Sequence, residues 1–134
     1  MKPDGLITLR SSHGPVQTMD RLVEAVTRNG MAVLARIDHA GAAEKVGLNL
    51  RPTEVVIFGN PKAGTPLMQE VQTTGIDLPL KALVWQDEAG ATWLSYNDPS
   101  WLAARHGLGS GKDKVLGIIS AALENCARQA TGNA

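Results

Sequence analysis

The spacing of hydrophobic positions changes along the chain between a two-residue and a 3.6-residue period. Residues 6–11 and 31–38 show the two-residue period and predict strands, the second with Val33 and Ile37 on one face. Residues 54–59 form an almost continuous apolar run, which is typical of a strand inside a sheet. These three segments are the first, second and third expected strands.

Residues 80–86 and 91–96 predict a fourth and a fifth strand. The four residues between them, Asp87-Glu88-Ala89-Gly90, have turn composition, with glycine where a positive φ is needed. The two strands are therefore expected to form an antiparallel hairpin.

Helical spacing appears between the strands. Apolar residues from Pro15 to Gly30 recur every three or four positions, and a short, weaker helix is expected over residues 40–46. The last helix is expected at about residues 112–128, with an apolar face of Val115, Leu116, Ile119, Ala122, Leu123 and Cys126.

A polar residue followed by proline recurs as a helix-start signal. Asn60-Pro61, Thr65-Pro66 and Asp98-Pro99 all have the form of an N-cap with proline at the first helical position. We expect Thr65-Pro66 to start a helix running through Val71, and Asp98-Pro99 to start one ending near Gly107. The glycines of residues 107–111 predict a flexible hinge.

The order of these elements does not follow the strict strand–helix alternation of a parallel sheet. It predicts an α+β fold: a two-layer sandwich with a curved, largely antiparallel five-stranded sheet, helices on one face and a long C-terminal helix. The length of 134 residues corresponds to a single domain, so we expect residues 1–134 to form one unit.

Composition narrows the classes of partner. Hydrophobic residues make up 43% of the chain and charged residues 19%, an ordinary globular balance. Thirteen basic and thirteen acidic residues cancel, and no one-sided basic cluster is visible, which argues against nucleic-acid and membrane-surface binding. Without a signal peptide or an apolar stretch of membrane-spanning length, a cytoplasmic location is expected.

Five short motifs occur in order through the middle of the chain: residues 36–39, 48–52, 58–68, 77–81 and 96–99, which read RIDH, LNLRP, FGNPKAGTPLM, DLPLK and YNDP. This series resembles the domain-of-unknown-function 302 family over about residues 5–108. The resemblance implies a TATA-binding-protein-like fold, in which a curved sheet holds a C-terminal helix, and it implies a homodimer. The family has no assigned activity, so the resemblance carries no catalytic residue.

The first candidate site is the loop of residues 59–65. It lacks the order of a Walker loop, because lysine comes before Gly64 and Thr65 follows it directly. If Gly64 and Thr65 open a helix, their free N–H groups favour an anion there. The alternative is that Asn60 and Thr65 only cap short helices.

The second candidate is the pair Asp38-His39 at a strand end, which has the chemistry of an acid–base couple. Neighbouring strand residues point to opposite faces, so the two side chains need not meet. Lys81 and Tyr96, on the hairpin strands, are further candidates for a pocket. The alternatives are that His39 flanks a helix, that Lys81 extends to solvent, and that Tyr96 edges the core.

Other chemistries lack a pattern. The three histidines form no pair with metal-ligand spacing, so no metal and no cofactor are expected. No Gly-x-Ser-x-Gly motif is present to anchor a hydrolase triad. Cys126, the single cysteine, is expected as a small buried apolar residue.

Three functions remain open, and the catalytic residues are unknown. We favour a dimeric domain that binds a small molecule or an anion between sheet and helix, through Asp38, His39, Asn60, Gly64, Thr65, Lys81 and Tyr96. One alternative is a protein-interaction or assembly module without a ligand. The other is an enzyme that uses Asp38, His39, Lys81 and Tyr96. Convergence of these side chains in one concavity would support binding or catalysis, and their dispersal would argue against both.

Overall fold

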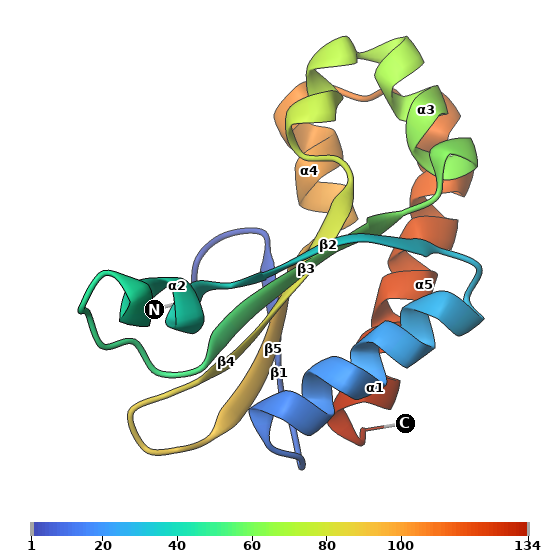
Figure 1. Cartoon of the computed structure of the whole chain (residues 1–134). Coiled ribbons are helices and arrows are strands. Elements are labelled where there is room, and N and C mark those ends of the chain that lie inside the picture. The colour runs from blue at the N-terminus through green and yellow to red at the C-terminus, as the bar shows by residue number, and fades with distance from the viewer. Residues whose placement is uncertain (1, 134) are drawn as a thin grey trace.

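The computed structural model describes residues 2–133, in which one five-stranded sheet is packed beside five α-helices and two 3₁₀ helices (Figure 1). In chain order the elements are β1 (Leu6–Arg10), α1 (Pro15–Arg28), β2 (Ala32–Asp38), α2 (His39–Lys45), β3 (Thr53–Gly59), α3 (Pro61–Glu70), η1 (Gln72–Ile76), β4 (Leu80–Gln86), β5 (Thr92–Asn97), α4 (Pro99–His106), η2 (Ser110–Lys112) and α5 (Asp113–Thr131).

The sheet is entirely antiparallel, with strand order β1-β5-β4-β3-β2. β3 lies between β4 and β2, as its continuous apolar run predicts. The β4–β5 hairpin forms as expected, with Gly90 at φ 87° in its turn. The side chain of Asp87 fixes the turn, because it accepts hydrogen bonds from the Ala91 N–H and the Trp93 indole N–H. The Trp93 bond is the main reason why the pKa of Asp87 is lowered.

β2 departs from the predicted alternation of faces. Its pairing with β3 is irregular between Val33 and Ala35, so Val33 is opposite Phe58 and Arg36 is opposite Val56. Phe58 and Val56 are both buried on the helical side of the sheet. Arg36 therefore shares a face with Val33, whereas simple alternation placed it opposite. A bulge changes the face of every later residue in a strand, and its position is not visible in the spacing of apolar residues.

Two helices cover one face of the sheet. α1 and α5 lie side by side there (Figure 1), which confirms the predicted two-layer α+β sandwich and its long C-terminal helix. They meet the sheet through one apolar core whose largest buried members include Met19, Leu22, Val26, Val56, Phe58, Val84, Leu94, Ile119, Leu123 and Cys126.

The remaining helices lie beyond the ends of the strands. α3, η1 and α4 form a group at one end of the sheet, and α2 lies near the opposite end of β2 (Figure 1). None of the helices in residues 2–133 is long and apolar enough to cross a membrane.

The start of α3 corrects the sequence-based expectation. The helix begins at Pro61 with Asn60 as its N-cap, so Thr65 does not cap a helix and Pro66 lies inside one. Both Asn-Pro and Thr-Pro satisfy the local signal. The first is used because the Asn60 side chain accepts the Lys62 N–H at 3.0 Å.

The expected hinge is also partly structured. α4 ends at Gly107, whose φ of 68° suits the left-handed conformation of a C-cap. The 3₁₀ turn η2 then leads into α5, which extends to Thr131, three residues beyond its expected end.

Candidate functional site

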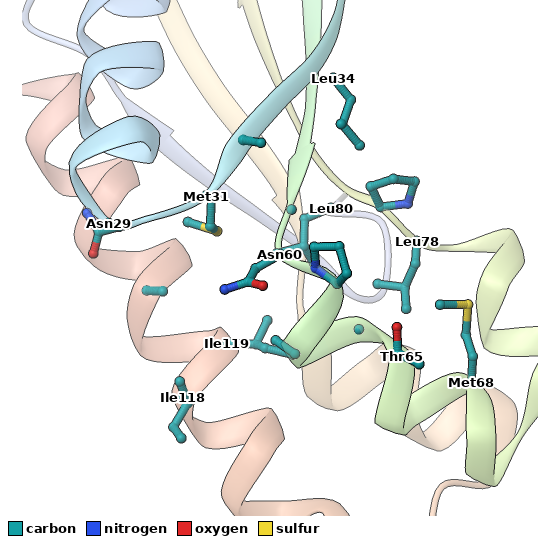
Figure 2. A pocket seen from close by; sticks show the side chains of 17 residues that line it. Asn29, Met31, Leu34, Asn60, Thr65, Met68, Leu78, Leu80, Ile118 and Ile119 are labelled. Carbon is teal, nitrogen blue, oxygen red and sulfur yellow. The ribbon is translucent and has the colours of Figure 1, made fainter.

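A cavity of about 540 Å³ lies where three elements meet, at the start of β2, the N-terminal half of α3 and the middle of α5 (Figure 2). The turn before β4 closes a fourth side. Most of the side chains that line it are apolar, including Met31, Leu34, Met68, Leu78, Ile118 and Ile119. Leu34 and Ile118 are more than half exposed, so the cavity opens to solvent between β2 and α5. Its volume lies within the range of about 300–1,000 Å³ that is typical of small-molecule sites.

The cavity contains few polar side chains and no ionisable one. Asn60, Thr65 and Asn29 supply the side-chain polar groups among its seventeen lining residues. The Asn29 side-chain amide donates to the Ala25 carbonyl at 2.8 Å. The side-chain carbonyl oxygen of Asn60 accepts the Lys62 N–H. In Figure 2 the amide nitrogen of Asn60 points into the open space between Met31 and Ile119.

The N-terminal turn of α3 is already saturated. Asn60 accepts the N–H groups of Lys62, Ala63 and Gly64, the first on its side chain and the other two on its main-chain carbonyl. Thr65 lies inside the helix and not at its start. The free N–H groups on which an anion at Gly64 and Thr65 depends are therefore not available at these positions.

Three of the seven candidate residues line this cavity: Asn60, Gly64 and Thr65. Asp38 and His39 do not. The Asp38 carboxylate caps α2 by accepting the Gly41 N–H at 2.9 Å, and His39 is exposed as the first residue of that helix. Asp38 borders a second, more polar cavity of about 440 Å³ beside α2.

Lys81 and Tyr96 lie on opposite faces of the sheet. Lys81 is opposite Ile57, whereas Tyr96 is opposite Ala82, the next residue along β4. The Lys81 ammonium donates to the carbonyl oxygens of Asp77 and Pro79 at the strand end. Tyr96 is buried in the core, and this burial raises the pKa of its phenol.

The acid–base set of the enzyme hypothesis is therefore not assembled, since Asp38, Lys81 and Tyr96 lie in three different places. Among residues 2–133 there is also no group of three or more His, Cys, Asp or Glu side chains placed to hold a metal ion.

A polar cluster that the sequence did not indicate joins η1 to α4. The Asp77 carboxylate accepts bonds from His106 Nε2 at 2.5 Å and from Arg105 Nη1 at 3.0 Å. Thr73 Oγ1 lies 3.0 Å from the other ring nitrogen of His106. Asp77 and His106 are 29 residues apart, so no spacing rule connects them. In the sequence, Asp77 stood out only as the first residue of the motif DLPLK, and His106 only as a residue near the end of an expected helix.

The model of a family described as "Domain of unknown function DUF302" matches residues 7–126. A crystal structure of an uncharacterized conserved protein DUF302 from Bacillus stearothermophilus superposes with a TM-score of 0.84 and 22% identity, covering 96% of this chain and 99% of that one. This likeness is one of fold.

Curated relatives come from Brucella. The chain is 43% identical over 129 residues to "Fluoride-specific ion channel FluC 1" of Brucella suis biovar 1. The aligned region covers 96% of this chain and 51% of the relative. "Fluoride-specific ion channel FluC 2" of Brucella melitensis biotype 1 matches at the same identity over 48% of its length. The chain thus spans about half the length of the curated relatives it matches.

Proposed function

The chain belongs to the DUF302 family, whose function is unknown, and from that premise we propose that it is a small-molecule-binding domain whose ligand occupies the 540 Å³ cavity. The observation that carries the proposal is the cavity itself: a half-open apolar hollow with a few polar groups at its wall, the usual form of a small-molecule site. Asn60, Gly64 and Thr65 are its candidate ligand-binding residues.

Filling the cavity tests this proposal. Ala122 faces the hollow from α5, whereas its neighbour Ala121 is exposed and does not line it. A compound that binds the native state raises its stability by RT ln(1 + [L]/Kd), which is about 2.7 kcal/mol at one hundred times Kd. At this chain length that corresponds to a rise in Tm of roughly 10 °C.

In a thermal-shift screen of nucleotides, anions and acyl compounds, hits on the unchanged protein should disappear in Ala122→Phe and persist in Ala121→Phe. A screen without hits, or hits that survive in Ala122→Phe, would contradict the proposal.

We also propose that the domain is a homodimer, and that its contact includes the apolar surface beside α2. Val16, Leu48 and Leu50, hereafter the α2 surface, are 76%, 64% and 48% exposed and border the same 440 Å³ cavity. Grouped exposed apolar side chains of this kind mark interaction surfaces. The same surface supports the alternative function, an assembly module without a ligand.

The names of the Brucella relatives suggest a setting for the domain. They are fluoride-specific ion channels, and the chain matches about half of each. We propose that the domain acts beside an ion channel as a regulatory part. Fluoride efflux should differ between cells that carry the Brucella suis relative with and without the half that this chain matches. Equal efflux would argue against a regulatory role.

A further inference from the structure

The cavity wall carries no charge with which an ionic ligand could pair. None of its seventeen lining residues is Asp, Glu, His, Lys or Arg. Transferring an ion from water to an apolar site without a partner costs several kcal/mol, so such a ligand would bind poorly or only in its neutral form. The wall itself therefore selects for an uncharged ligand.

The Asn60 amide has a fixed orientation. The Lys62 N–H is a donor, so the Asn60 atom 3.0 Å from it must be the carbonyl oxygen Oδ1. The other amide atom is then the nitrogen Nδ2, and Figure 2 shows that it faces the cavity from this exposed residue. Within residues 2–133, Nδ2 has no protein acceptor, which leaves its two N–H groups for a ligand or water.

The other polar side chains of the wall, Asn29 and Thr65, contribute differently. The Asn29 amide N–H is used within the protein, bonded to the Ala25 carbonyl. The Thr65 hydroxyl can donate or accept, so it does not discriminate between ligand types. Asn60 Nδ2 can only donate, so a ligand group that bonds to it must be an acceptor.

We infer that the ligand is an uncharged, mostly apolar molecule that presents a carbonyl or ether oxygen to Asn60 Nδ2. This inference rests on the function proposed above and adds the ligand class. It excludes inorganic anions, fluoride included, and carboxylates as ligands of the cavity.

Three probes of one skeleton test the class: 4-phenylbutan-2-one, butylbenzene and 4-phenylbutanoate. Their binding is followed through the methyl NMR signals of Ile118 and Ile119, which line the cavity. A neutral hydrogen bond contributes about 0.5–1.5 kcal/mol, so the ketone should bind roughly 2- to 12-fold tighter than butylbenzene. The carboxylate should bind more than about tenfold weaker than the ketone.

Two variants isolate the Asn60 donor. Asn60→Asp retains an oxygen that can accept the Lys62 N–H, and Asn60→Gly leaves a residue that is itself favoured at N-caps, so α3 stays capped in both. Both lose the amide N–H groups, and only the first adds a charge. Each should reduce the preference for the ketone over butylbenzene to about onefold. Gln69→Glu is the matched control: it makes the same amide-to-carboxylate change at an exposed position of α3 that does not line the cavity, and it should retain the preference.

The possible failures are distinct. A carboxylate that binds tighter than the ketone, or a ketone preference that persists in both Asn60 variants, overturns the ligand class while leaving cavity binding intact. If no probe moves the Ile118 and Ile119 signals, or if these signals change with protein concentration because a second copy fills the hollow, the small-molecule function fails and this inference fails with it.

Discussion

Asp77 links the end of η1 to α4 within the group of helices at the end of the sheet. Its side chain is 14% exposed, and that of His106, which bonds to it, is 6% exposed. Arg105 is more exposed, and its contact with Asp77 adds a second, solvent-screened interaction. The contribution of Asp77 therefore rests mainly on satisfying the buried ring of His106.

Replacement of Asp77 by alanine should lower the free energy of unfolding by about 1–3 kcal/mol, because it leaves a buried imidazole N–H without its acceptor. Urea unfolding monitored by tryptophan fluorescence measures this change. Asp20→Ala is the control, since Asp20 is 64% exposed and lies 3.9 Å from Arg36. It should change stability by less than about 0.5 kcal/mol. Equal effects of the two substitutions would show that burial of the cluster is unimportant.

Cys126 gives a pH dependence of defined sign. Burial raises the pKa of its thiol above the ordinary 9.0. Burial, followed by the charge of Glu124, raises that of Tyr96 above 10.0. The folded protein thus keeps these protons to higher pH than the unfolded chain does. Stability should be unaffected below the unfolded value and should fall as pH rises through about 9 and beyond.

The decline should be shallower in Cys126→Ala than in the unchanged protein, as measured by urea unfolding between pH 8 and pH 11. Comparing the slopes of stability against pH cancels the pH-independent loss of stability that the smaller alanine side chain causes. Parallel declines would indicate that the thiol does not take part.

At the scale of single elements, the helix ends follow local chemistry closely. Asn60 and Asp98 each cap a helix by accepting the N–H of the residue two positions later. Gly107 ends α4 in the left-handed conformation, with nothing within 4 Å of where a Cβ would lie. Gly117 also has open space there, but it lies inside α5. Because an added Cβ meets no neighbour at either position, substitutions at the two glycines report the effect of backbone conformation without an effect of packing.

The same substitution should have opposite effects at these two positions. Gly107→Ala places a Cβ in the left-handed region and should destabilise the protein by about 1–2 kcal/mol. Gly117 lies inside a helix, where alanine adopts the backbone conformation without strain. Gly117→Ala lowers the chain entropy of the unfolded state and should stabilise the protein by about 0.5–1 kcal/mol. Thermal unfolding of both variants provides the comparison, and a shift of the same sign in both would refute this conformational account.

At the scale of the whole molecule, the cavity and the α2 surface lie in different places. The cavity is formed by β2, α3 and α5, and the α2 surface lies between the start of α1 and the segment after α2. No lining residue is shared between the two. A dimer formed through the α2 surface therefore leaves the cavity open to a ligand.

Leu48→Glu should convert the proposed dimer to a monomer, because it places a charge in the apolar contact. Sedimentation velocity over a range of concentrations measures the change. Ile76→Glu is the matched control: Ile76 is 73% exposed but lies in η1, beyond the other end of the sheet. If the protein without substitutions sediments as a monomer, or if both variants dissociate, this contact is ruled out.

The sequence by itself determined most of the elements and one strand pairing, that of the β4–β5 hairpin. Apolar period, turn composition and N-caps act within a few residues, so the β4–β5 hairpin, the inner place of β3 and the buried face around Cys126 were all accessible from local pattern. The start of α3 was not, because two cap-and-proline signals five residues apart satisfy the same local rule.

Only the tertiary structure decided which side chains meet. The cavity joins residues as distant in sequence as Met31 and Ile119, and the Asp77 cluster joins two segments by packing at the end of the sheet. The bulge in β2 reversed the face of Arg36, and the strand register put Lys81 and Tyr96 on opposite faces. Such proximities depend on register and packing over the whole chain, which residue spacing does not encode.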